Sequence, residues 1–126
     1  MRHIVLILLV MVLILTGCEG KMKRDYQKIT PEEVKKMIDT PEVIIMDVRE
    51  QNEFDSGHIP GAVLLSARTI SEDTDAAVIP KTDTIVLVYC RSGNRSKTAS
   101  AALVDVGYSN IFEFGGINTW PHEVEK

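Results

Sequence analysis

Residues 84–96 read TIVLVYCRSGNRS, and this stretch determines how the rest of the chain is interpreted. Its first six residues are β-branched, aliphatic or aromatic, which is typical of a buried strand. The run ends at Cys90, and a polar loop with one glycine and two arginines follows. Residues 96–106 then predict a helix. Cys90 is therefore expected at the carboxyl end of a strand and before a helix, where open α/β sheets bind ligands.

This position favours a reactive thiol at Cys90. A helix amino terminus presents unpaired N–H groups and a partial positive charge. Both stabilise the thiolate, which is the nucleophilic form of cysteine. We therefore expect a lowered pKa for Cys90, with Arg91 and Arg95 adding to the effect.

The amino-terminal segment predicts export. Ile4 to Leu15 is an unbroken apolar run of 12 residues that follows Arg2, and a spanning helix needs ~20 residues. A short apolar run with a basic start matches the core of a signal peptide. Leu15-Thr16-Gly17-Cys18 then resembles a bacterial lipobox, in which the cysteine is lipidated. An uncleaved anchor with an incidental Cys18 is the alternative. The chain is accordingly divided into a signal peptide (1–17), a lipidated tether (18–25) and a folded domain (26–126).

Location and partners follow from this division. The domain is expected outside the cytoplasmic membrane, anchored to it by lipid at Cys18. The whole chain has a net charge of −4, and loss of Arg2 with the signal would make it more negative, which argues against a nucleic-acid partner.

The chain has two cysteines. With Cys18 lipidated, Cys90 has no partner for an internal disulfide and is a candidate reactive thiol. A buried structural cysteine is the alternative.

The rest of the domain alternates between strands and helices. Thr30, Pro31 and Glu33 form a helix start with a capping box. An edge strand is predicted at 26–29, a short helix at 50–55, and strands at 43–48, 63–65 and 111–114, the strand at 63–65 being buried. This alternation predicts a parallel sheet with helices on both faces, a doubly wound α/β domain.

Several motifs occur in order along the domain: DVRE at 47–50, EF at 53–54, GHIPGA at 57–62, VYCRSGNRS at 88–96 and GGINTW at 115–120. Together they resemble a single-domain rhodanese, or sulfurtransferase. The resemblance implies a doubly wound fold with a five-stranded, mostly parallel sheet. It also implies transfer of sulfane sulfur from thiosulfate or a similar donor to a thiophilic acceptor such as cyanide or a thiol, through a persulfide on the cysteine.

The resemblance and the local chemistry assign roles to the cysteine loop. Cys90 is the expected nucleophile. The substrate-binding loop is expected to cradle the persulfide with backbone N–H groups curled around Gly93. Ser96 is expected to cap the helix or to donate its hydroxyl to the persulfide. Arg95, more than Arg91, is favoured to hold an anionic donor. The loop comprises Arg91, Ser92, Gly93, Asn94, Arg95 and Ser96.

Other polar residues are assigned to structural support. Asp47 and Arg49 are expected to form a buried pair that holds the loop beside the site, and His58 is expected to pack and to form hydrogen bonds. No spacing of His, Cys, Asp and Glu matches a metal site, and no phosphate-binding glycine motif occurs. We therefore expect no metal and no cofactor. The expected partners are a small sulfur-containing anion and a thiol acceptor, and the expected state is a monomer.

Two alternatives to a sulfurtransferase stay open. A rhodanese-like domain can act as a non-catalytic sulfur carrier or docking module, although loss of the cysteine would mark such a domain. Phosphatases and arsenate reductases of the rhodanese fold have a loop that is one residue longer between cysteine and arginine. Here four residues separate Cys90 from Arg95, and the tighter loop suits a single sulfur atom. Polysulfide handling cannot be separated from thiosulfate transfer by these residues.

Overall fold

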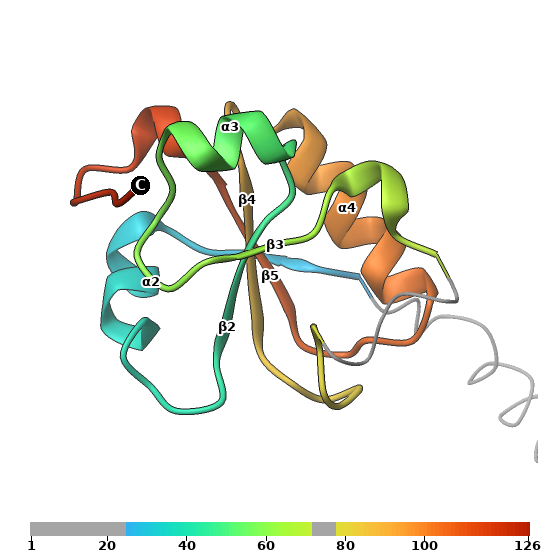
Figure 1. Cartoon of the computed structure of the whole chain (residues 1–126). Helices are drawn as coiled ribbons and strands as arrows, with labels where there is room; N and C mark the ends of the chain where they lie inside the picture. The colour runs from blue at the N-terminus through green and yellow to red at the C-terminus, as the bar shows by residue number, and fades with distance from the viewer. Residues whose placement is uncertain (1–24, 72–77) are drawn as a thin grey trace, which may run out of the picture.

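The computed structural model describes residues 25–71 and 78–126 (Figure 1). The predicted signal peptide at 1–17 and the lipidation site Cys18 lie outside the described residues, as does nearly all of the predicted tether. Within the described ranges, no helix is long and apolar enough to cross a membrane.

A parallel sheet forms the centre of the domain (Figure 1). Within the described residues it has five strands in the order β1-β5-β4-β2-β3, and each of its pairings is parallel. All five residues of the central strand β4 are buried. The sheet is thus parallel throughout rather than mostly parallel. The strands are β1 (Gln27–Lys28), β2 (Ile44–Asp47), β3 (Val63–Leu64), β4 (Val86–Cys90) and β5 (Ile111–Gly116).

Helices cover both faces of the sheet, which confirms the predicted doubly wound α/β class. The helices are α2 (Pro31–Met37), α3 (Gln51–Ser56) and α4 (Asn94–Asp105), with the 3₁₀ turns η1 (Ala67–Thr69) and η2 (Ile117–Thr119), and α2 and α4 pack on opposite faces. The capping box predicted for α2 is present. Thr30 Oγ1 accepts the Glu33 N–H at 3.2 Å, and Thr30 N–H donates to the Glu33 carboxylate at 3.3 Å.

The alternation of side chains along β4 divides the core into two clusters. Val86, Val88 and Cys90 pack in one cluster with residues of α4. Leu87 and Tyr89 pack in the other, together with a residue of α2. Successive side chains of a strand point to opposite faces, so the Cys90 side chain lies on the α4 side. The helix α3 lies across the end of the sheet at which β4 ends (Figure 1).

The structure corrects two details of the predicted elements. The strand at 63–65 is not buried, because β3 is at the edge of the sheet and Val63 is 38% exposed. The helix after the cysteine begins at Asn94 rather than at Ser96. Its N-cap is Gly93, which has a left-handed conformation (φ 103°) that is strained for residues with a side chain.

Asp47 and Arg49 form the predicted buried ion pair at the end of β2. Arg49 Nε donates to both Asp47 oxygens at 3.0 and 3.1 Å, and Arg49 Nη2 lies 2.7 Å from Asp47 Oδ2. Arg49 Nη2 also donates to the Gly57 carbonyl at 2.7 Å. Burial alone would lower the pKa of Arg49, but the hydrogen bond and the charge of Asp47 raise it. The pair therefore joins the end of β2 to the loop after α3.

Replacement of Asp47 by Ala is expected to lower the free energy of unfolding by about 3–5 kcal/mol, because it leaves the buried Arg49 charge without its partner. Urea denaturation measures the loss. Arg68→Ala is the matched control. It breaks the Arg68–Glu50 pair, in which the Arg68 side chain is 76% exposed, and exposed pairs contribute little. Equal losses in the two variants would contradict a structural role for the buried pair.

Candidate active site

Cys90 is the last residue of β4 and is 1% exposed. It forms no disulfide within residues 25–71 and 78–126. The register between β4 and β5 shifts between Val88 and Cys90, so that Cys90 lies opposite Gly116. The chain then turns through residues 91–93 into α4. The sulfur is therefore enclosed between two strand ends and the start of a helix, as predicted for a site at the carboxyl edge of the sheet.

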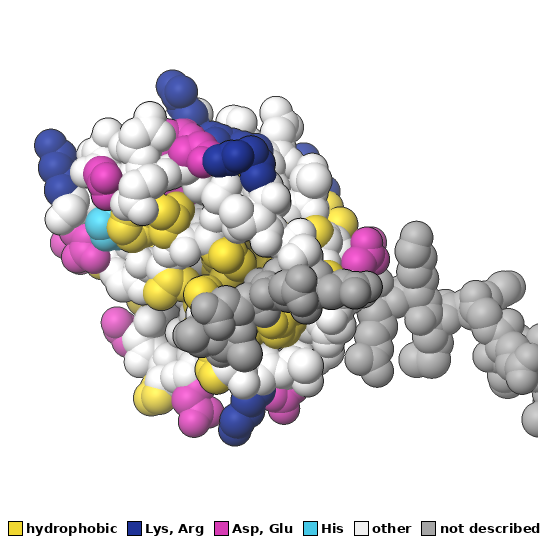
Figure 2. All heavy atoms as spheres, turned by 45° about the vertical axis from the view of Figure 1, so that its right-hand side comes forward, with side chains coloured by type: hydrophobic (Ala, Val, Ile, Leu, Met, Phe, Trp, Pro, Cys, Tyr) yellow, Lys and Arg dark blue, Asp and Glu magenta, His cyan; other side chains and the backbone are white. Residues whose placement is uncertain are grey.

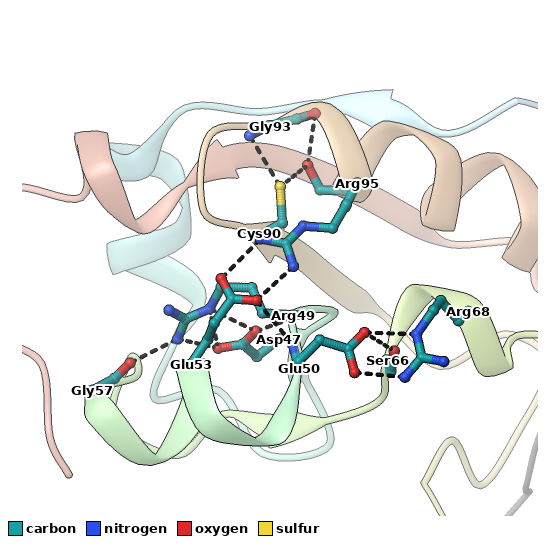
Figure 3. A network of polar contacts seen from close by, with 11 residues as sticks. Asp47, Arg49, Glu50, Glu53, Gly57, Ser66, Arg68, Cys90, Gly93 and Arg95 are labelled. Carbon is teal, nitrogen blue, oxygen red and sulfur yellow. Dashed lines mark hydrogen bonds and ion pairs between the residues drawn. The ribbon is translucent and has the colours of Figure 1, made fainter.

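Hydrogen-bond donors surround the sulfur (Figure 3). The Gly93 N–H donates to Cys90 Sγ at 3.0 Å, and Ser96 Oγ lies 3.5 Å from the sulfur. Burial raises the pKa of the Cys90 thiol. The Ser96 hydroxyl and the N–H groups of Ser96, Gly93 and Ser92 outweigh burial, and the net effect lowers the pKa. The lowered pKa of Cys90 agrees with the sequence prediction. Its main cause is the hydroxyl and N–H dipoles rather than Arg91 and Arg95.

A close backbone contact holds the loop in place. A Cβ atom added at Gly116 would lie 2.0 Å from the Arg91 carbonyl oxygen and 2.6 Å from the Ser92 nitrogen. These are backbone atoms that cannot rotate away, so only glycine fits. The Arg91 carbonyl also accepts the Asn118 N–H at 3.1 Å. The GGINTW motif is thus part of the site, because its backbone supports the cysteine loop.

The Ser96 hydroxyl connects the cysteine loop to a buried carboxylate. Ser96 is fully buried in the first turn of α4, and its hydroxyl lies 2.7 Å from Glu113 Oε1. Glu113 belongs to β5 and is 3% exposed. Glu113 lies in the strand predicted at 111–114, and no sequence motif assigns it a role. The signal that could have identified it is a charge between Phe112 and Phe114 in a predicted strand.

Arg95 is bound by a carboxylate (Figure 3). Its Nη1 and Nη2 lie 2.7 and 2.9 Å from the two Glu53 oxygens, which links α4 to α3. The hydrogen bond from Arg95 lowers the pKa of Glu53 to about 2. Two of the five N–H groups of Arg95 are directed to Glu53 in this arrangement, and its role in holding a substrate anion stays a prediction. Sequence spacing alone did not identify Glu53 as the partner.

Arg91 is exposed, and its guanidinium makes no ion pair with any residue in the described part of the chain. It is the more exposed of the two arginines, and which of them holds an anion stays a prediction. Ser92 and Asn94 are exposed beside it. On the face in Figure 2, lysine and arginine side chains lie beside acidic ones rather than in a separate basic patch.

His58 is held by its own contacts, and its side chain is 11% exposed. Its ring stacks on Phe54 with centroids 3.8 Å apart, and Nδ1 lies 2.9 Å from the Phe54 carbonyl oxygen. Nε2 lies 3.3 Å from Glu125. Both ring nitrogens are engaged, as expected for a packing and hydrogen-bonding role.

Among residues 25–71 and 78–126, no group of His, Cys, Asp and Glu could hold a metal ion.

The comparison with protein families now identifies the domain. The model of the rhodanese-like domain matches residues 30–123. The chain belongs to the rhodanese-like domain family. The match includes β2, the cysteine loop and the GGINTW motif, so all of the site described above lies within it.

Curated relatives of this rhodanese-like domain include sulfurtransferases. The chain is 31% identical over 96 residues to the thiosulfate sulfurtransferase GlpE of Coxiella burnetii, covering 75% of this chain and 87% of the relative. It is 35% identical over 99 residues to a Mycobacterium tuberculosis protein named probable adenylyltransferase/sulfurtransferase MoeZ. That match covers 77% of this chain but only 25% of the relative, so the chain corresponds to one part of a longer protein.

Solved structures confirm the rhodanese-like fold. A rhodanese-related protein from Thermoplasma volcanium matches with a TM-score of 0.66 at 24% identity, covering 79% of this chain and 98% of the other. A structure described as rhodanese with anions from E. coli matches with a TM-score of 0.61 at 25% identity, covering 67% and 98%.

Replacement of Gly116 by Ala is expected to lower the free energy of unfolding by about 3 kcal/mol, because the methyl group would force the Arg91 backbone away. Gly61→Ala is the matched control. Gly61 has a positive φ of 80° but no atom within 4 Å of an added Cβ, so backbone strain of about 1 kcal/mol is its expected cost. Thermal or urea unfolding compares the two. A smaller loss of unfolding free energy for Gly116→Ala than for Gly61→Ala would contradict this prediction, because it would show that the Arg91 backbone can shift at little cost.

The rate of Cys90 alkylation against pH is expected to have a midpoint below ~8.5, the ordinary value for cysteine, because the N–H groups and Ser96 stabilise the thiolate. Reactivity should rise as the pH increases through this lowered pKa. Ser96→Ala removes one donor and should move the midpoint upward. Thr98→Ala, which removes an exposed hydroxyl from the same helix, should leave it unchanged. A midpoint at or above ~8.5 in the unaltered protein would contradict the role of the loop.

Proposed function

We propose that this rhodanese-like domain is a sulfurtransferase that carries sulfane sulfur on Cys90. The donor is thiosulfate or a similar compound, and the acceptor is a thiophile such as cyanide or a thiol. One observation supports the proposal above the others. Cys90 Sγ accepts the Gly93 N–H at 3.0 Å at the start of α4, in a loop whose donors lower the pKa of its thiol.

In the proposed mechanism the Cys90 thiolate attacks the outer sulfur of thiosulfate. The bond between the two donor sulfurs breaks, and its electron pair leaves with sulfite. Cys90 then carries a persulfide whose outer sulfur is attacked by the acceptor, and the electron pair of the Cys90–sulfur bond returns to Cys90. Covalent catalysis of this kind divides one difficult transfer into two easier steps. Backbone N–H groups of the loop supply the donors for the negative persulfide.

Arg91 is the proposed binding group for an anionic donor. It is exposed beside the loop, whereas the Arg95 guanidinium is held by Glu53. A guanidinium binds oxyanions through charge-assisted hydrogen bonds. The description of the E. coli structure as rhodanese with anions is consistent with an anionic donor for this domain as well.

The two alternative functions are less well supported. A docking module needs neither a cysteine with a lowered pKa nor a set of N–H donors around its sulfur. A phosphatase or arsenate reductase directs the arginine after its cysteine at the oxyanion, and here two of the five N–H groups of Arg95 are directed at Glu53 instead. The loop between Cys90 and Arg95 is also one residue shorter than in those enzymes.

The proposed place of action is the outer face of the cytoplasmic membrane. The proposal rests on the lipobox that ends at Cys18, outside the described residues, and on the apolar run before it. The domain would then act as a monomer tethered by lipid, on small sulfur compounds and thiol acceptors.

Replacement of Cys90 by Ser is expected to abolish sulfur transfer while the fold is kept, because the variant has no thiol to form the persulfide. Intact mass of the purified protein is measured before and after excess thiosulfate, and then after cyanide. The unaltered protein should gain one sulfur atom and lose it as thiocyanate. Cys18→Ser is the matched control, since it removes the other cysteine and should load normally. Substantial transfer by Cys90→Ser would overturn the mechanism.

The same mass measurement with polysulfide in place of thiosulfate tests the chemical class of the sulfur donor. Loading by polysulfide but not by thiosulfate would keep the Cys90 carrier and change the donor class. Failure of both donors, with Cys90 still open to alkylation, would overturn the sulfurtransferase proposal in favour of a docking module or an oxyanion hydrolase.

A further inference from the structure

The helix α3 differs from the other two helices in what holds it to the domain. None of its residues is buried, whereas α2 buries Val34 and α4 buries several side chains. Its large apolar side chain, Phe54, stacks on the neighbouring His58 and belongs to neither core cluster of the described residues. A segment with few buried apolar contacts opens at a low free energy. Polar contacts therefore have to hold α3 in place.

The chain on either side of α3 is firmly anchored. Before the helix, Arg49 is buried and pairs with Asp47. After it, the Gly57 carbonyl accepts from Arg49 Nη2 at 2.7 Å. The buried Ile59 then donates its N–H to the Tyr89 hydroxyl at 3.1 Å. Any motion of α3 is therefore a hinge motion between these two fixed ends.

One ion pair joins α3 to the helix that follows the cysteine. The Glu53 oxygens accept from Arg95 Nη1 and Nη2 at 2.7 and 2.9 Å. The Arg95 side chain passes beside Cys90 to reach them (Figure 3). Among residues 25–71 and 78–126, no other hydrogen bond or ion pair joins the side chains of α3 to another helix or strand. This pair is thus the polar contact that fixes α3 over the site.

The position of α3 bears on access to the sulfur. The helix lies across the end of the sheet at which β4 ends (Figure 1), and Cys90, the last residue of β4, is 1% exposed. A reagent has to touch the sulfur to react, so one of the surrounding elements has to move. The Gly116–Arg91 backbone contact holds the cysteine loop, and buried side chains hold α4. Motion of α3 requires the least free energy of the three.

We propose that α3 is a lid over Cys90 and that the Glu53–Arg95 ion pair is the latch that keeps this lid closed. The structure shows the closed state. Loss of the pair lets α3 turn about its two ends and opens the sulfur to a donor or an acceptor. The proposal rests on the sulfurtransferase function above only for the identity of these reagents. Glu53 does not touch the sulfur, so it is a positioning residue that controls access.

The latch sets the fraction of molecules in which the sulfur is open. When opening and closing are fast, the observed rate of a reaction at Cys90 is proportional to this open fraction. The Arg95 and Glu53 side chains are 39% and 24% exposed, and such partly exposed pairs contribute modestly. Loss of the pair is therefore expected to raise the open fraction about 2- to 5-fold.

Alkylation of Cys90 by iodoacetamide, an uncharged reagent, tests the latch on the full chain. The rate is followed by mass spectrometry on the peptide that contains Cys90. It is taken from the plateau at high pH, where all of Cys90 is thiolate and a change in its pKa has no effect. Glu53→Gln should raise this plateau rate about 2- to 5-fold. The amide oxygen can still accept the Glu50 N–H that caps α3, but the charge that holds Arg95 is lost.

Asp55→Asn is the matched control. It makes the same change of charge on the same helix, and the recorded hydrogen-bond partner of Asp55 is Gln51, also in α3. The plateau rate of this variant should equal that of the unaltered protein. An equal rise in Asp55→Asn and Glu53→Gln would overturn the latch, because it would show an effect of charge alone.

Arg95→Gln removes the latch from the other side. Its plateau rate should rise by a similar factor, and the double variant Glu53→Gln/Arg95→Gln should rise no further, because both changes remove one interaction. Hydrogen exchange gives an independent measurement. The amides of α3 should exchange faster than those of α4 in the unaltered protein, and Glu53→Gln should speed the exchange of α3.

The outcomes separate the lid from the sulfurtransferase function. An unchanged plateau rate in both Glu53→Gln and Arg95→Gln would overturn the lid, and so would α3 amides that are as well protected as those of α4. Circular dichroism checks that each variant folds. If Glu53→Gln does not fold, Arg95→Gln and the exchange of the unaltered protein decide. Intact mass after thiosulfate and after polysulfide is measured on the same samples. The expected alkylation rates without any gain of sulfur would overturn the sulfurtransferase and leave the lid intact.

Discussion

The contact between the β5 backbone at Gly116 and the Arg91 carbonyl is the constraint on which the cysteine loop depends. The two backbone segments approach so closely that a Cβ added at Gly116 would lie 2.0 Å from the Arg91 oxygen. This oxygen also accepts the Asn118 N–H, which holds the loop against β5. With the loop held there, the Gly93 N–H is directed to Cys90 Sγ. The electrostatics of the sulfur thus depend on the absence of a side chain on the neighbouring strand.

Oriented dipoles, rather than net positive charge, shape the environment of the cysteine. Glu53 pairs with Arg95, and the carboxylate charge offsets part of the field of that guanidinium. The N–H groups of the loop and the Ser96 hydroxyl remain, and they lower the pKa of Cys90 against the effect of burial. The same hydroxyl contacts a buried carboxylate. The sulfur, the first turn of α4 and β5 therefore form one hydrogen-bonded unit.

The features that the sequence predicted well have local causes. A continuous apolar run identified β4, and Thr30, Pro31 and Glu33 identified the start of α2. Asp47 and Arg49 are two residues apart, and their ion pair was predicted from that proximity and the end of a strand. The features that it missed join distant segments. Glu53 and Arg95 are 42 residues apart, and Ser96 and Glu113 are 17 apart.

The sequence by itself determined the doubly wound α/β class, the strand and helix around Cys90 and the motifs of the rhodanese-like family, because periodicity, capping and turn residues act over short spans of chain. Only the tertiary structure decided which arginine pairs with Glu53, which carboxylate contacts Ser96 and that β3 lies at the exposed edge. Such contacts depend on strand order and on the direction in which each side chain leaves its element. Packing of the whole domain sets both, and no local pattern encodes them.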